Sequence, residues 1–149
     1  MNICKVPVLV LFLAGAVPVL ADSVIFNEIM YHSTPAAPEQ NSLEWVELFN
    51  RSTNVINLSG WRFSKGVKFA FPNVNLPAGG YIIVAANTNA FSTRYPGVPN
   101  VTGNWLGVLS NNGDDLELQR PDGTVEDSVS YASEGDWAIR QRGPLDIGH

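Results

Sequence analysis

The chain has 149 residues, of which 45% are hydrophobic and 15% charged, and its formal net charge is −5. An acidic chain without a block of basic residues repels a phosphate backbone, which argues against nucleic acid as its main partner. The single cysteine, Cys4, excludes an internal disulfide and a thiolate metal site. We therefore expect one domain whose core is large enough to need no covalent staple.

Residues 1–21 have the pattern of an export signal. Lys5 precedes an apolar run from Val6 to Leu20, and the run ends at Ala21 in the small-residue pattern of a cleavage site. The run is short for a membrane span, and Asp22 follows it without a basic stop. We expect cleavage after Ala21 and a secreted or cell-surface protein with no transmembrane segment.

The rest of the chain consists of short apolar stretches separated by turn residues. The predicted strands cover residues 23–31, 44–50, 61–64, 67–71, 81–86, 105–109, 115–120 and 125–131. The continuous apolar run 81–86 predicts a central strand covered on both faces. One short helix is predicted at 87–95, where Phe91 and Tyr95 are four residues apart and Pro96 follows. About eight short strands with almost no helix predict an antiparallel β-sandwich or barrel.

The stretch Asn57-Leu58-Ser59-Gly60-Trp61 combines a polar turn with a large aromatic residue. Gly60 can adopt a backbone conformation that is closed to other residues, and Trp61 can bury a large apolar surface. We interpret this stretch as a structural anchor of the core, and we interpret Trp45 as a core residue too.

Catalytic chemistry is poorly represented. The histidines are His32, beside a loop, and His149, and there is no cysteine beyond Cys4, so no nucleophile and base can be assembled from the sequence. We predict a domain that is not an enzyme. A hydrolase that uses His32 or Glu47 is the third-ranked alternative.

Calcium is the cofactor that the sequence leaves open. Asp114, Asp115 and Asp122 crowd two turns that could adjoin in a sandwich, and acidic turns supply the oxygen ligands that calcium takes. Asp before Gly is also ordinary turn chemistry. Asp127 shares the parity of Val125 and Val129, so we expect it to point inward and to bind turn amides.

Aromatic side chains near loops suggest a second ligand class. Trp105 and Trp137 could form a platform on which a glycan stacks, although packing in the core is the favoured interpretation of both.

Several motifs together resemble those of the lamin tail domain family in its bacterial exported form. They are Phe26-Asn27-Glu28-Ile29-Met30-Tyr31, Glu44-Trp45-Val46-Glu47-Leu48-Phe49-Asn50, Leu58-Ser59-Gly60-Trp61, Phe69-Ala70-Phe71-Pro72, Leu76-Pro77-Ala78-Gly79-Gly80-Tyr81, Leu109-Ser110-Asn111-Asn112-Gly113-Asp114 and Asp127-Ser128-Val129-Ser130-Tyr131. The resemblance implies an immunoglobulin-like β-sandwich without known catalytic residues. From the residues themselves we interpret Leu58, Gly60, Trp61, Trp45 and Tyr81 as structural anchors. Bacterial members resemble parts of larger exported proteins, beside domains such as CotH-like kinases or nucleases.

The resemblance ends before the end of the chain. Residues 133–149 are polar and irregular, whereas family members usually continue to a last strand, so we expect the sandwich of residues 22–132 to lack that strand. The leading hypothesis is a non-catalytic exported module that contacts proteins or cell surfaces, or that positions a neighbouring domain. The alternative is a calcium- or glycan-binding accessory domain of a multidomain enzyme.

Overall fold

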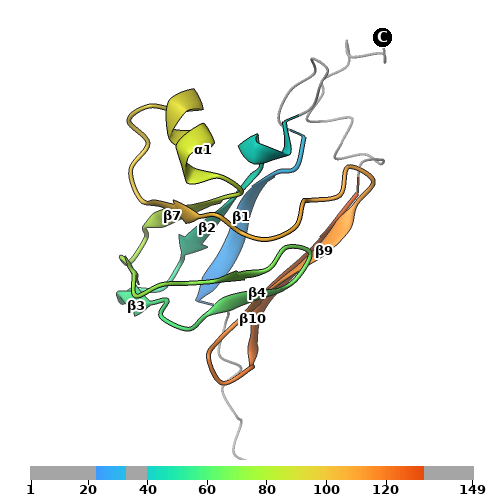
Figure 1. Ribbon diagram of the computed structural model, residues 1–149. Coiled ribbons are helices and arrows are strands. Elements are labelled where there is room, and N and C mark those ends of the chain that lie inside the picture. The colour runs from blue at the N-terminus through green and yellow to red at the C-terminus, as the bar shows by residue number, and fades with distance from the viewer. Residues whose placement is uncertain (1–22, 33–39, 133–149) are drawn as a thin grey trace, which may run out of the picture.

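Two four-stranded sheets face each other across an apolar core (Figure 1). The computed structural model describes residues 23–32 and 40–132, so the predicted signal at 1–21 and the segment 133–149 lie outside the described residues. The first sheet has the order β1 (Val24–Met30), β2 (Trp45–Asn50), β7 (Tyr81–Ala85) and β8 (Val101–Gly103). The second has the order β10 (Val125–Tyr131), β9 (Asp114–Gln119), β4 (Arg62–Lys65) and β5 (Phe69–Ala70).

Three smaller elements complete the described part of the chain. A two-stranded ribbon pairs β3 (Ile56–Asn57) with β6 (Asn75–Leu76), and a 3-10 turn, η1 (Asn41–Leu43), precedes β2. The helix α1 (Thr88–Arg94) begins at Asn87, whose side chain accepts a hydrogen bond from the amide of Ala90. Among the described strands, all ladders are antiparallel except that of β7 with β8. The immunoglobulin-like β-sandwich is confirmed.

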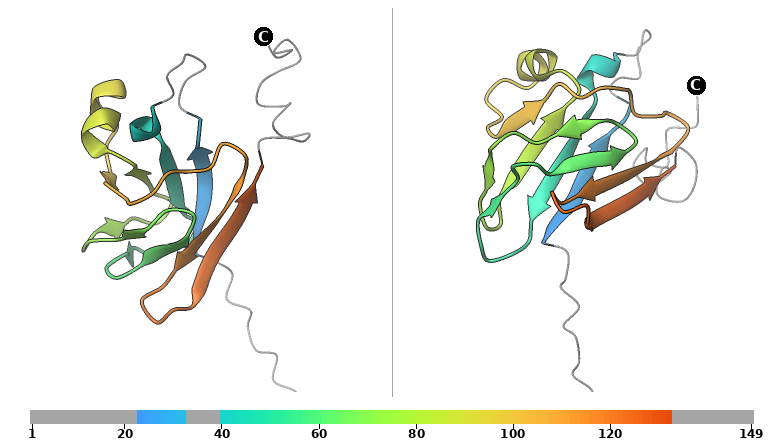
Figure 2. Two further views of the ribbon diagram at one scale, coloured as in Figure 1. Left: turned by 45° about the vertical axis from the view of Figure 1, so that its right-hand side comes forward. Right: turned by 60° about the horizontal axis from the view of Figure 1, so that its bottom comes forward.

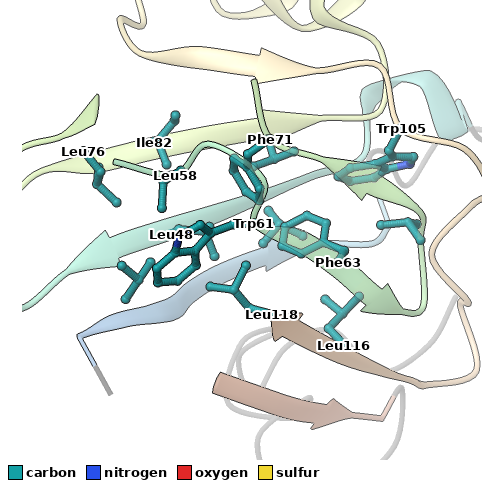
Figure 3. Close-up of a cluster of buried hydrophobic side chains, with 14 of the residues drawn as sticks. Leu48, Leu58, Trp61, Phe63, Phe71, Leu76, Ile82, Trp105, Leu116 and Leu118 are labelled. Carbon is teal, nitrogen blue, oxygen red and sulfur yellow. The ribbon is translucent and has the colours of Figure 1, made fainter. Parts of the chain in front are cut away.

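The main core lies between the sheets and takes side chains from both (Figure 3). Its buried members alternate with outward-facing residues along the strands, as the period of two requires. They include Leu48, Ile82 and Val84 from the first sheet, Phe63, Leu116 and Leu118 from the second, Leu76 from β6, and Leu58, Trp61, Phe71 and Trp105 from the connections. Because Trp105 is only 6% exposed, it is a core residue and offers no surface for stacking a glycan.

The turn at Leu58–Trp61 is an anchor of this core, as predicted. The Trp61 amide donates to the Leu58 carbonyl at 3.0 Å, and Gly60 has a φ of +77°, which a residue with a Cβ rarely adopts. The Asn57 side chain accepts from the Ser59 amide at 2.9 Å and stabilises the turn. Leu58 is fully buried and Trp61 is 6% exposed, so the turn fixes two core side chains at once.

The helix covers part of the outer face of the first sheet (Figure 2). Phe91 packs against Trp45 with ring centroids 6.2 Å apart, and Ile83 and Ala85 complete this small cluster. Trp45 is therefore buried under α1 and lies outside the main core between the sheets.

Three sequence expectations need correction. Residues 105–109 form no strand, because Leu106 makes only one isolated bridge, to Lys68. β8 and the β3–β6 ribbon lie in stretches predicted as connections. Tyr81, expected as a buried anchor, is 46% exposed because it begins β7 on the outer face, beyond the reach of α1.

Candidate functional site

The two sheets meet along a seam between β1 and β10, which are edge strands of different sheets (Figures 1 and 2). The Val24 amide contacts Glu126 at one end of the seam, and the rings of Tyr31 and Tyr131 stack at 4.9 Å near the other. The strands therefore run in the same direction, side by side, without a backbone ladder between them.

Carboxylates of β10 hold the first half of the seam together. Glu126 Oε1 accepts hydrogen bonds from the Ser23 amide at 2.6 Å, the Ser23 hydroxyl at 2.7 Å and the Val24 amide at 2.9 Å. One residue further, Asp127 Oδ2 accepts from the Phe26 amide at 2.8 Å. Side chains thus satisfy amides of an exposed strand edge that would otherwise be open to pairing with another chain. We call this arrangement the Glu126–Asp127 clasp.

Glu126 is also connected to the core. Its Oε2 forms an ion pair with Arg120, and the Arg120 guanidinium lies 5.7 Å from the ring centroid of Trp61. Burial by itself raises the pKa of Glu126, but the hydrogen bonds from Ser23, Val24 and Arg120 outweigh burial and hold that pKa below its ordinary value. The side chain is therefore a charged, fully bonded link between the seam and the anchor turn.

Glu126 was missed by the sequence reasoning because of a β-bulge. The register of β10 against β9 shifts between Val125 and Asp127, so Val125 is 47% exposed and Glu126 is 2% exposed. Strict alternation predicted the opposite. Asp127 is half-buried, and its acceptor role was expected, but its partner across the seam is a strand amide and not a turn amide.

Beyond the clasp the seam opens into a groove of about 330 Å³. Its walls are mainly apolar, and its lining residues are Phe26, Asn27, Glu28, Ile29, Val129, Ser130 and Tyr131. The Tyr131 hydroxyl donates to the Ser110 carbonyl at 3.0 Å, and burial, followed by the negative charge of Asp114, raises the pKa of Tyr131. Tyr131 is therefore neutral at physiological pH, and it lines the groove as an uncharged aromatic side chain.

The three aspartates proposed as calcium ligands are not brought together. Asp114 and Asp115 begin β9, whereas Asp122 lies in the turn at the other end of the β9–β10 hairpin. The Asp122 carboxylate accepts from the Thr124 amide at 2.9 Å, which lowers its pKa. In residues 23–32 and 40–132, no three His, Cys, Asp or Glu side chains are grouped so that they could hold a metal ion. The expectation that the two acidic turns adjoin is wrong.

A second buried acid, Glu44, was also not recognised as a structural residue. It is 1% exposed, and its Oε2 accepts from the Leu109 amide at 2.8 Å, while its carbonyl accepts from the Ala86 amide. Glu44 therefore fixes the segment before β9 against the first sheet. The sequence offers no signal for this contact, because it joins residues that are 65 positions apart.

Neither candidate for catalysis, His32 or Glu47, lines the groove. His32 is exposed at the end of the first described segment. Glu47 lies on the outer face of β2, where it accepts a hydrogen bond from the Asn27 side chain at 2.7 Å. The hydrogen bond of Glu47 joins it to a side-chain amide and not to a nucleophile.

The comparisons with known proteins agree with this architecture. The model of one protein family, the lamin tail domain, matches residues 20–133, which is most of the chain. The chain belongs to the lamin tail domain family. Lamin tail domains are immunoglobulin-like modules that are generally non-catalytic. No curated protein matches this lamin tail domain significantly. Among its described residues, no helix has the length and hydrophobicity needed to cross a membrane.

Proposed function

We propose that this lamin tail domain is an exported, non-catalytic module of a bacterial protein, and that it binds an extended segment of a partner protein along the seam. The observation that carries the proposal is the apolar groove between two parallel sheet edges, next to the Glu126–Asp127 clasp. Edge strands are the usual place where proteins capture extended peptides, because the peptide can add main-chain hydrogen bonds and insert alternate side chains.

The size and lining of the groove favour a peptide over the other ligands considered. A volume of about 330 Å³ holds a few side chains, and Phe26, Ile29 and Val129 offer apolar contact. A calcium ion requires several converging oxygens, and a sugar requires polar partners around its hydroxyl groups. Among the described residues no three acidic, histidine or cysteine side chains are grouped to hold a metal ion, and the groove lining is mainly apolar, so a peptide with apolar side chains is the better occupant.

Selection from a library of displayed peptides tests the proposal. We expect enriched peptides to bind the protein and its Val125→Glu variant, and to lose at least tenfold in affinity for Val129→Glu. Val125 lies on the same strand but is exposed outside the groove lining, so its variant controls for added charge on β10. Equal binding by both variants, or chemical-shift changes confined to residues away from β1 and β10, would contradict the seam as the binding site. The affinity of the same protein for calcium and for oligosaccharides is measured too, and binding of either would favour the alternative of an accessory domain.

Export is tested separately. The full chain, produced in a bacterial host, is expected outside the cytoplasm with Asp22 as its first residue on N-terminal sequencing. An uncleaved chain that stays in the cytoplasm would contradict the export proposal and would leave the peptide-binding proposal standing.

A further inference from the structure

The outer face of the first sheet carries rows of side chains whose order is set by strand register. From the helix outward, the rows are Met30–Trp45–Ala85, Glu28–Glu47–Ile83 and Ile25–Phe49–Tyr81. Phe91 of α1 packs on the first row, and the helix reaches no further than Ile83 of the second. The third row and the two carboxylates therefore form a surface that the described part of the chain leaves uncovered. We call these residues the aromatic–acidic face.

The aromatic part of this face is a stacked pair of rings. Phe49 and Tyr81 have centroids 4.6 Å apart and an interplanar angle of 29°, and Tyr81 is 46% exposed. Ile25 lies across from Phe49 and extends the apolar surface to the edge strand. Exposed aromatic residues that form a contiguous surface commonly mark sites of interaction.

The acidic part lies in the next row. Glu28 is directly opposite Glu47 across the β1–β2 ladder, and the one polar contact between described residues here is the hydrogen bond from Asn27 to Glu47. In the part of the chain that the structure describes, neither carboxylate forms an ion pair. Partial burial and then the negative charge of Glu47 raise the pKa of Glu28. A cation placed here relieves the repulsion between two like charges.

We infer that the aromatic–acidic face binds a lysine or arginine side chain from a basic segment of a partner protein. The carboxylates of Glu28 and Glu47 supply the charge complement, and the rings of Phe49 and Tyr81 attract the cation and pack on its aliphatic stem. An organic cation uses both halves of the face, whereas a metal ion gains nothing from the rings. Arg51, the residue directly after β2, already has an interaction of its own.

This inference goes beyond the proposed function. Glu28 borders both the groove and the aromatic–acidic face, but Val129 lines only the groove, whereas Glu47 and Tyr81 belong only to the face. Variants at these three residues therefore let the two proposals fail independently.

The experiment compares two short synthetic peptides on the intact protein by calorimetry and by NMR. One peptide carries two arginines separated by glycine, and the other carries neutral citrulline in their place. We expect binding of the arginine peptide with shifts at Phe49 and Tyr81, and no measurable binding of the citrulline peptide. Tighter binding at a pH above the pKa of Glu28 than below it is the second expected result.

Variants matched in charge separate this site from general attraction to an acidic protein. Glu47→Gln is expected to weaken arginine-peptide binding at least fivefold, and Tyr81→Leu about two- to fivefold, the usual range for a cation–π contact at an exposed site. Asp122→Asn removes the same charge from the far hairpin turn and should leave binding within a factor of two. Each variant replaces a side chain that is exposed or half-buried, and an unchanged thermal melt verifies its fold.

Three results would overturn the inference. They are equal weakening by Glu47→Gln and Asp122→Asn, equal binding of the citrulline peptide, and a preference of the face for a neutral oligosaccharide over the arginine peptide.

Discussion

Glu126 offers the sharpest test of how the two sheets are joined. Replacing it by alanine removes the acceptor of the buried Val24 amide, and an unsatisfied buried donor costs about 1–3 kcal/mol. Arg120 loses its partner too, but its side chain is 32% exposed and regains water, so its share is at most about 1 kcal/mol. We therefore expect Glu126→Ala to lower the free energy of unfolding by about 1–4 kcal/mol.

The isosteric variant separates charge from shape. Glu126→Gln keeps one oxygen for Ser23 and Val24 but turns an amide toward Arg120, so its expected cost is about 1–2 kcal/mol. Glu28→Gln, an exposed acid on the neighbouring strand, should change the stability by less than about 0.5 kcal/mol. Urea denaturation followed by tryptophan fluorescence measures all three, and amide exchange at Val24 localises the effect. The clasp would have no energetic role if Glu126→Ala cost no more than Glu28→Gln, or if Val24 kept its protection.

The other predictions concern the anchor turn, one close approach and one ion pair. Trp61→Ala should lower the free energy of unfolding by about 3–5 kcal/mol in chemical denaturation, because it leaves a cavity where a side chain only 6% exposed was packed. A loss below about 1 kcal/mol would mean that Trp61 is exposed to solvent. Gly103→Ala should separate β8 from β7, because a Cβ there would lie 2.0 Å from the Ala85 carbonyl oxygen. Gly97→Ala is the control, since Gly97 also has a positive φ but has open space around it, and this variant should lower the stability by only about 1 kcal/mol. Thermal melts of both variants measure the difference. The hydrogen bond from Lys65, followed by those from Ser64 and Gln119, lowers the pKa of Glu117 from 4.5 to about 2. The stability that the charged Glu117 adds is complete above pH 4.5 and disappears as the pH falls to 2. The difference in free energy of unfolding between the protein and Glu117→Gln should therefore shrink to zero over that interval in an acid titration. A difference that stays constant would refute the lowered pKa of Glu117.

Local sequence patterns predicted most of the fold, because turns and the alternation of side chains along a strand depend mainly on neighbouring residues. The turn at Gly60 and the helix that ends before Pro96 follow from residue types that favour one backbone conformation. Leu116 and Leu118 alternate with Glu117 and Gln119 in the sequence, and both lie in the core, as the period of two requires.

The errors arise where distant residues decide the outcome. A strand of two or three residues, such as β3 or β8, has too little sequence to show a period, and its existence depends on the partner beside it. The bulge before Asp127 reverses the parity of β10 and buries Glu126, an outcome that alternation cannot anticipate. Asp114 and Asp115 are close to Asp122 in the sequence, but β9 runs between them, so they lie at opposite ends of that strand.

The parallel course of β1 and β10 also determines how the domain bears mechanical load (Figure 2). A pull on the start of β1 and on the end of β10 makes the two strands slide past each other, so the seam is loaded in shear along its length. The hydrogen bonds from the Val24 and Phe26 amides to Glu126 and Asp127 cross this seam, so they resist the sliding together with the stacked rings of Tyr31 and Tyr131.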